Sequence, residues 1–296
     1  MTSPDTGGAA LQELRRLLIA VQFLTRLQVP AWVGWSPAQA RASLRYLPLV
    51  GLGIGTVAAG VVLVALHWWS LPVAVGLSLV VTMLLTGALH EDGLADCCDA
   101  LGGGGRDREK VLSILKDPRV GSFGAVGLIL VLGLKTALWL DLLDQVGSLH
   151  AFAGDGDGPT LTVPQAVVAG GMLAVLLSGM ASHALSRLSL LVVMARLDYA
   201  RPPGSGGRSE GLAQRPGAME LAVAGLVALA PLAALGTQGW PLENLLGAAL
   251  APLSIGGMAM TLMRQRLGGW VGDGLGATQQ LAEVAVLLSL CAVRNV

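Results

Sequence analysis

Residues 71–99 read LPVAVGLSLVVTMLLTGALHEDGLADCCD, an apolar run that ends in a cluster of acids. Leu71 to Leu89 contain no charged side chain, and a run of this length is close to the 20 or so residues that a helix needs to cross a bilayer. Carboxylates next to such a run are costly and are usually retained for a function. The stretch therefore predicts a membrane fold with a site at its surface. The ionisable residues that follow the run are His90, Glu91, Asp92, Asp96 and Asp99.

The composition of the whole chain is that of an integral membrane protein. Hydrophobic residues make up 53% of the 296 and charged residues 13%, whereas a soluble domain carries about 25% charged residues. The mean hydropathy is +0.67. A formal net charge of zero gives no reason to expect nucleic acid as a partner. Three cysteines, two of them adjacent, make neither a disulfide framework nor a zinc pattern. Residues 1–10 are polar, are expected to be disordered and lack the pattern of a secretory signal.

Runs long enough to span a bilayer recur along the chain and predict an all-α polytopic bundle, with residues 1–296 forming one membrane-embedded domain. A charged and interrupted run, Leu11 to Val29, is predicted to be an interfacial or re-entrant helix instead. Residues 187–196 either extend the fourth span or form a separate short element. The seven expected spans, of which the last is short, are Leu47 to Leu66, Leu71 to Leu89, Val120 to Leu140, Val163 to Ser186, Ala218 to Leu235, Leu245 to Met263 and Leu281 to Val293.

The basic residues indicate how these spans are oriented. All of them except Lys135 and Arg294 precede the first span or follow the second, fourth and sixth. The positive-inside rule therefore places the N-terminus, the acidic cluster and these loops on the cytoplasmic side of a bacterial inner membrane, within reach of soluble nucleotides. Lys135 falls inside the third span, where Asp141 or Asp144 could neutralise it or the side chain could snorkel.

The spacing of the acids after residue 90 suggests a metal site. In a helix, Asp92, Asp96 and Asp99 stand at i, i+4 and i+7 and share one face, with Glu91 and His90 at its edge. Three carboxylates on one face repel each other unless a cation lies among them. Oxygen ligands suit Mg²⁺, which usually takes one or two carboxylates together with water and substrate phosphates. The alternative is a solvated helix end whose acids complement the helix dipole.

Three loops on the same side carry groups that suit phosphate. Glycines at 102–105 are followed by Lys116, Arg119 and Ser122 in the sequence KDPRVGSFG, where backbone N–H groups and positive charge could bind an anion. Arg106 and Arg108 could do the same or only set the topology. The second loop contains Arg201, and the third, GGWVGDGLGA at 268–277, contains Asp273, a second metal ligand or a helix N-cap. His183 is a candidate substrate contact or a helix-packing histidine.

Taken together and in order, these motifs resemble those of the cobalamin synthases, the adenosylcobinamide-GDP ribazoletransferases. The resemblance covers nearly the whole chain. The chain departs from the family pattern at two places. Ala100 stands where the family commonly has Gly, and many members carry an acid near Gln279 or Gln280. In this chain, Asp273 and Glu283 are therefore the acids of the last motif. The motifs that carry the resemblance are QFLTRLQVP at 22–30, HEDGLAD at 90–96 with Asp99 and the glycine run, KDPRVGSFG at 116–124, YAR at 199–201 and GDGLGA at 272–277.

The resemblance implies a Mg²⁺-dependent transfer, in which α-ribazole or its 5′-phosphate displaces GMP from adenosylcobinamide-GDP. The expected metal ligands are Asp92, Asp96, Asp99 and Asp273, and Glu91 is an auxiliary group. His90 is the candidate general base, although a hydrogen-bonding role that orients a neighbour fits equally well. A homo-oligomer is a further candidate assembly. The residues expected to contact substrate are Lys116, Arg119, Ser122, His183, Arg187 and Arg201.

Two other functions fit parts of the pattern. An enzyme resembling the CDP-alcohol phosphotransferases would also place spaced aspartates at a membrane face, but its motif is longer and spaced differently. An ion-coupled transporter would use the acids to bind a coupling ion. Transporter acids are expected near the middle of the bilayer on broken helices, often within an internal repeat. Here the acids lie at one end of a span, and the acidic motif is not repeated.

Overall fold

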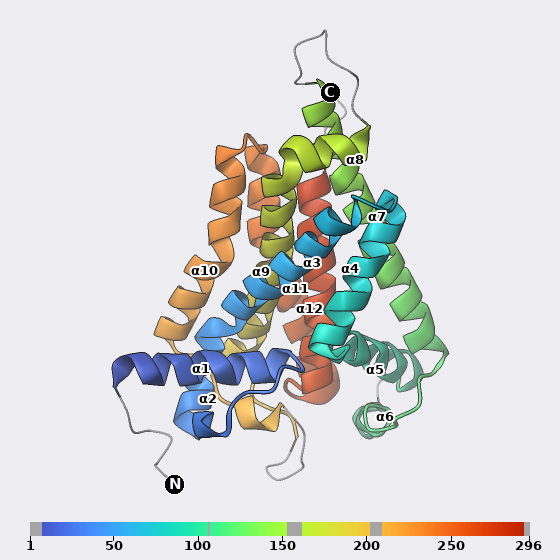
Figure 1. The fold of residues 1–296 in the computed structure, drawn as a ribbon. Coiled ribbons are helices and arrows are strands. Elements are labelled where there is room, and N and C mark those ends of the chain that lie inside the picture. The colour runs from blue at the N-terminus through green and yellow to red at the C-terminus, as the bar shows by residue number, and fades with distance from the viewer. Residues whose placement is uncertain (1–7, 106, 153–161, 202–208, 293–296) are drawn as a thin grey trace.

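The fold is a bundle of helices, seen in a computed structural model that describes residues 8–105, 107–152, 162–201 and 209–292 (Figure 1). Those residues form no named strand, and an isolated bridge joins Tyr199 to Trp270. The expected disorder of residues 1–10 is only partly open to comparison, because residues 1–7 lie outside the described ranges. Ala9 and Ala10 begin helix α1, so that expectation is wrong for these two residues.

Six helical segments within the described residues are long and apolar enough to cross a membrane, which confirms the polytopic all-α prediction. Their mean hydropathy is high, between 1.2 and 2.2, as burial in a bilayer requires. The count becomes seven if one bent helix pair is included as a single span. The six segments are Pro37–Ala65, which ends in α3 (Leu47–Ala65), Ser122–Ser148 in α7 (Ser122–Phe152), α9 (Met172–Arg196), α10 (Ala218–Thr237), α11 (Leu242–Leu267) and α12 (Gly272–Cys291).

The bent pair is the region of residues 71–99. Helix α4 (Leu71–Thr86) ends at Gly87, which adopts a left-handed conformation with φ of +68° and donates its N–H to Met83. Ala88 is also left-handed, and α5 (Leu89–Gly103) then leaves at 90° to α4. The predicted span therefore stops at Thr86. Two consecutive left-handed residues turn the chain, so the acid-bearing helix α5 crosses the end of the bundle instead of continuing through it (Figure 1).

Other short helices lie at the same end of the bundle as α5. Helix α1 (Ala9–Leu24) runs across the spans, as the interfacial prediction expects, and α2 (Pro37–Ser43) and α6 (Arg108–Ile114) are found nearby (Figure 1). Ser36 caps α2 by accepting a hydrogen bond from the Gln39 N–H at 3.3 Å. This end of the molecule thus presents helices that lie across the spans, and it carries the groups singled out from the sequence.

Helices α9 and α12 are the most buried spans and form the centre of the bundle. Residues 187–196 extend α9, which settles whether they form a separate element. Before α9, the predicted fourth span contains a short helix α8 (Val163–Ala166) and a π-helical turn at Val167–Gly171. Glycines bring α3 against α9: a Cβ on Gly51 would lie 2.5 Å from the His183 carbonyl oxygen. Close contact between backbones explains why small residues line this interface.

Helix α12 begins at Gly272, well before the predicted start at Leu281. The glycine-rich motif, which suggests a loop when read alone, is the first turn of the helix. Its glycines pack closely against other elements, because Gly274 contacts Met263 and Gly276 faces the His90 backbone. Helical glycine is unfavourable in isolation, by about 1 kcal/mol relative to alanine, so this close packing is the compensation.

Candidate functional site

The site is assembled where α5 crosses the start of α12. A Cβ on Gly93 would lie 2.7 Å from the Asp273 carbonyl oxygen, and a Cβ on Gly276 would lie 3.2 Å from the His90 carbonyl oxygen. Side chains larger than hydrogen would push the two helices apart. The glycines therefore bring α5, which carries Asp92 and Asp96, against the first turn of α12, which carries Asp273.

The carboxylates at this crossing carry more negative charge than the residues around them neutralise. Burial and neighbouring charges raise the pKa of the Asp96 carboxyl to about 6. An ion pair of 2.8 Å joins the Arg201 Nη2 to the Asp273 Oδ2. One guanidinium among several carboxylates leaves a net negative site, which favours a bound cation. The neighbours that raise the pKa of Asp96 are, in decreasing order of effect, Asp92, Asp273 and Asp99.

Arg201 reaches this crossing because two loops pair through their backbones. The Ala200 N–H donates to the Trp270 carbonyl, and the Trp270 N–H donates to the Asp198 carbonyl, both at 2.9 Å. Tyr199 packs its ring on Trp270, with ring centroids 4.9 Å apart. Trp270 itself is buried. The segment after α9 and the segment before α12 are thereby held together, with Arg201 and Asp273 at their ends.

Asp273 is not the N-cap of α12. The capping position is Val271, and Asp273 lies in the first turn, where its carboxylate pairs with Arg201. A carboxylate in the first turn still interacts favourably with the helix dipole. Of the two roles that the sequence left open for Asp273, the cap is wrong, and the role of metal ligand stays a prediction.

Asp99 makes contacts that its sequence position does not reveal. Its Oδ2 accepts a hydrogen bond from the Gly121 N–H at 2.7 Å, and its Oδ1 accepts one from the Gly124 N–H at 2.8 Å. These are among the free donors at the start of α7. Asp99 thus acts as a helix cap supplied by another helix, and it ties α5 to the KDPRVGSFG segment. Its role as a metal ligand stays a prediction.

The predicted phosphate-binding residues lie on the exposed connection between α6 and α7. Lys116 is exposed, and Ser122 is the first residue of α7. The Arg119 side chain is 85% exposed and pairs with Asp117 at 2.5 Å. Hydrogen bonds from Arg119 lower the pKa of the Asp117 carboxyl to about 2. Arg119 is therefore positioned by its neighbour and points away from the interior, while the start of α7 offers backbone donors to an anion.

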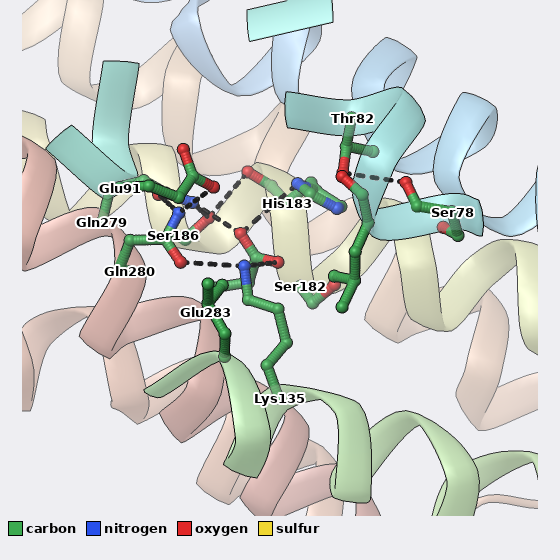
Figure 2. Close-up of polar contacts among 12 residues, drawn as sticks. Ser78, Thr82, Glu91, Lys135, Ser182, His183, Ser186, Gln279, Gln280 and Glu283 are labelled. Atoms are coloured by element: carbon green, nitrogen blue, oxygen red, sulfur yellow. Dashed lines mark hydrogen bonds and ion pairs between the residues drawn. The ribbon is translucent and has the colours of Figure 1, made fainter. Parts of the chain in front are cut away.

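A second polar cluster is buried among the spans (Figure 2). Its centre is Glu283 of α12, whose side chain is 2% exposed. The Lys135 Nζ of α7 lies 3.0 Å from the Glu283 Oε1. On the other carboxylate oxygen, Arg187 and His183 of α9 approach to 3.6 and 3.4 Å. Lys135 therefore pairs with Glu283, neither with Asp141 nor with Asp144, and it does not snorkel to the membrane surface.

Two glutamines of α12 link this buried cluster to α5. Gln279 donates to the Glu283 Oε2 at 2.6 Å and to the Ser186 Oγ at 3.0 Å. Gln280 accepts a hydrogen bond from Lys135 at 2.8 Å and donates one to the Glu91 Oε1 at 2.9 Å. A continuous chain of contacts thus runs from the interior to the helix that carries Asp92 and Asp96 (Figure 2).

Three of the predicted site residues belong to this buried side. His183 and Arg187 are 5% and 1% exposed, and the Arg187 Nη1 lies 2.9 Å from the His183 Nδ1. His90 is 3% exposed. Within the part of the chain that the structure describes, the His90 Nε2, the Glu91 Oε2 and the Arg187 Nε have no hydrogen-bond partner. The structure thus separates these residues from the exposed loop of Lys116 and Arg119, and the catalytic role of His90 and Glu91 stays a prediction.

Sequence reasoning missed the partner of Lys135 and the role of the two glutamines. The sequence did contain a sign that Lys135 has a partner, because ionisable residues within spans are rare and normally pair with one another. Lys135 and Glu283 are such residues, but they are separated by half the length of the chain, and spacing alone does not reveal a pair at that separation. Gln279 and Gln280, read as a departure from a family pattern, turn out to be buried connectors.

The residues at the α5–α12 crossing suit magnesium. Among the described residues no three or more His, Cys, Asp or Glu side chains lie together as a group that could hold a metal ion. Mg²⁺ does not require such a group, since it commonly binds through one or two carboxylates and takes water and substrate phosphates as its other ligands. Asp92, Asp96 and Asp273 offer hard oxygen ligands, and their uncompensated charge fits a divalent cation.

Comparison with known proteins agrees with this arrangement. The family model described as cobalamin-5-phosphate synthase matches residues 16–291. An adenosylcobinamide-GDP ribazoletransferase of Leptothrix cholodnii is 41% identical, with 95% of this chain and 96% of the relative aligned. The enzymes of the same name from Polaromonas naphthalenivorans and Shewanella baltica are 38% and 33% identical, over 95% and 96% of this chain and 98% and 97% of their own lengths.

No solved structure matches the chain. The family match covers nearly all of the chain, including α5, α7, α9 and α12, whose residues build both polar clusters. The aligned relatives extend over almost the same length. The chain therefore belongs to the cobalamin-5-phosphate synthase family.

Proposed function

We propose that this chain transfers the adenosylcobinamide-phosphate group from adenosylcobinamide-GDP to α-ribazole, or to α-ribazole 5′-phosphate, and releases GMP. The observation that carries the proposal is the close crossing of α5, which carries Asp92 and Asp96, with the first turn of α12, which carries Asp273, in a chain whose relatives are named for this transfer. An oxygen of the ribazole forms a bond to the phosphorus attached to the corrinoid. The bond from that phosphorus to the bridging oxygen breaks, GMP leaves with that oxygen, and the proton of the attacking hydroxyl passes to a base.

The residues of the crossing would hold the diphosphate and its metal. Asp92, Asp96 and Asp273 would bind Mg²⁺, which neutralises the charge that develops on the phosphate oxygens when it is present. Arg201 orients Asp273 through their ion pair and extends a positive charge to the same place. Because phosphoryl transfer depends mostly on positioning and on charge neutralisation, the fixed crossing of α5 and α12 is the main contribution of the fold.

The connection between α6 and α7 would bind the outer part of the diphosphate. Lys116, Arg119 and Ser122 precede or begin α7, where the backbone N–H groups that Asp99 does not occupy would face an anion. Asp99 holds this helix start against α5 through two hydrogen bonds. We therefore assign Asp99 to positioning, between the metal-binding face of α5 and the phosphate-binding start of α7.

The buried cluster would hold α5 in place on the side that faces the interior of the bundle. Gln280 joins Lys135 to Glu91, the residue next to Asp92. This contact sets the rotation of α5 about its axis and so the direction in which its carboxylates point. Glu91 and His90 then act on the reaction through orientation, and either one accepts the proton only if the substrate reaches the buried side of α5.

The active site would face the cytoplasm. The lateral helices α1, α2, α5 and α6 lie at one end of the bundle (Figure 1), and the sequence places nearly all basic residues in the loops of that side. Impermeant thiol labelling of whole cells tests this orientation with Gly105→Cys as the reporter. We expect no labelling until the cells are opened, and efficient labelling of intact cells would contradict the proposed side.

The activity is tested by GMP release from the purified full chain. Adenosylcobinamide-GDP and α-ribazole should give stoichiometric GMP and a ribazole-containing corrinoid when Mg²⁺ is added, and none after chelation with EDTA. Asp96→Asn, which removes a charge at nearly constant volume, is the matched control. Release of CMP from a CDP-alcohol instead would favour the phosphotransferase alternative, and Mg²⁺-independent turnover would remove the metal from the proposal.

A further inference from the structure

A cavity of about 570 Å³ lies between α5, α6, α11 and α12. This volume falls within the range of roughly 300–1,000 Å³ that small-molecule pockets occupy. Its wall is almost entirely apolar, and none of the described residues that line it is acidic. The cavity is therefore distinct from the carboxylate crossing. Lining residues that matter below are Leu94, Cys98, Leu101, Met258, Leu262 and Ala277.

The cavity and the carboxylates occupy opposite faces of α5. Leu94, Cys98 and Leu101 follow one another at i, i+4 and i+7 and line the cavity. Asp92, Asp96 and Asp99 have the same spacing but begin two residues earlier, which is a rotation of about 200° around the helix. Whatever fills the cavity would press on the back of the helix that holds the metal-binding acids.

One side of the cavity opens toward the bilayer. Met258 and Leu262 of α11 are 69% and 38% exposed, and Leu281 of α12 is 43% exposed, although all three line the cavity. Exposed apolar side chains on membrane spans face lipid tails. An acyl chain can therefore enter from the side without crossing a polar surface.

The other side of the cavity ends at a basic rim. Arg264 and Arg266 lie in the last turn of α11, and Arg266 lines the cavity while donating to the Gly105 carbonyl. Arg108 donates to the Leu267 carbonyl at 2.9 Å, which adds a third positive charge at the end of α11. Of the nearby acids, Asp107 is occupied in capping α6, and Glu109 is exposed in its first turn. Positive charge remains in excess at this rim.

We propose that the cavity holds an acyl chain of an anionic phospholipid whose headgroup contacts Arg266, at the rim that Arg264 and Arg108 make more positive. Lipid tails in the bilayer are as apolar as the cavity wall, so the tail alone gives no preference for this place. The headgroup supplies the preference, because basic residues near the membrane surface attract anionic lipid. The lipid would then brace α5 from the membrane side. The inference concerns lipid binding and does not depend on the proposed reaction.

The test measures which lipid the full chain retains. The protein is reconstituted in vesicles of equal parts phosphatidylcholine and phosphatidylglycerol, extracted in mild detergent, and its bound lipid is identified by mass spectrometry. Phosphatidylglycerol should be retained over phosphatidylcholine by at least about fivefold, the factor expected from one basic side chain near the membrane surface. Equal retention of the two lipids would overturn the proposal.

Variants locate the lipid. R264Q/R266Q should remove the preference, and A277F, which fills the cavity, should lower the retention of both lipids. R196Q, at the exposed end of α9, is the matched control and should behave as the unaltered chain does. An unchanged preference in R264Q/R266Q overturns the proposal even if A277F does not fold. Displacement of the lipid by α-ribazole alone also overturns it, since the cavity would then belong to a substrate.

Discussion

The two polar clusters of this protein differ in how their charges are balanced. In the buried cluster, Glu283 is contacted by Lys135, Arg187 and His183, and Gln279 donates a hydrogen bond to its Oε2. At the α5–α12 crossing, several carboxylates share Arg201 as their cation. A balanced cluster inside a bundle stabilises the arrangement of its helices. An unbalanced one at a surface needs a cation from outside, and this difference separates a supporting role from a reactive one.

The largest effect on turnover should come from the unbalanced cluster. Asp96→Ala removes a proposed metal ligand of that cluster, and GMP release should fall by more than about a hundredfold, since even outer partners of metal ligands commonly account for 10 to 100-fold. Thermal unfolding in detergent should change little, because the substitution relieves repulsion between carboxylates. Activity within about tenfold of the unaltered enzyme would show that the crossing is not the reactive centre.

The balanced cluster should respond in the opposite way. Glu283→Ala leaves Lys135 and Arg187 buried without their carboxylate, and breaking a buried pair in this way costs about 3–5 kcal/mol of stability. The measurement is the unfolding midpoint in detergent, with Lys135→Met combined with Glu283→Ala as the control that removes one of the stranded charges. If the Glu283→Ala variant were as stable as the unaltered protein, the buried cluster would not have the supporting role proposed for it.

A smaller effect is expected where the two helices touch. Gly93→Ala places a methyl group 2.7 Å from the Asp273 backbone oxygen, and the resulting shift of α5 should lower kcat by about ten to a hundredfold, the cost of misplacing reacting groups by about 1 Å. Gly53→Ala is the matched control, because a Cβ there meets nothing within 4 Å. Equal activity of the two variants would mean that the crossing tolerates a shift.

The smallest of the four expected effects should come from substituting the exposed basic residues before α7. Lys116→Ala or Arg119→Ala is expected to raise the KM for adenosylcobinamide-GDP or lower turnover by at least about tenfold, as for the loss of a charge-assisted contact of about 1.5–3 kcal/mol. Arg106→Ala serves as the control in the same loop and should change kcat/KM much less. The reverse ranking, measured at equal membrane yield, would move the phosphate site to another part of the loop.

Much of this description follows from local properties of the sequence. The apolar runs identify the spans, since burial in a bilayer depends on composition over about 20 residues. The spacing of Asp92, Asp96 and Asp99 places them on one face because a helix repeats every 3.6 residues. The distribution of basic residues predicts the orientation in the membrane, because the number of Lys and Arg residues is a local property of each loop. None of these inferences needs to know which helices are neighbours.

Only the tertiary structure shows how these pieces meet. The 90° bend at Gly87 and Ala88, the arrival of Asp273 beside Asp96, and the pairing of Lys135 with Glu283 each depend on how helices distant in the chain are rotated and how closely they approach. Glycines at helix–helix contacts decide how closely the backbones approach. Their effect cannot be read from one helix alone, because it depends on the helix packed against it. The same reason explains why Asp99, one of three similar acids in the sequence, caps α7, whereas its neighbours face the crossing.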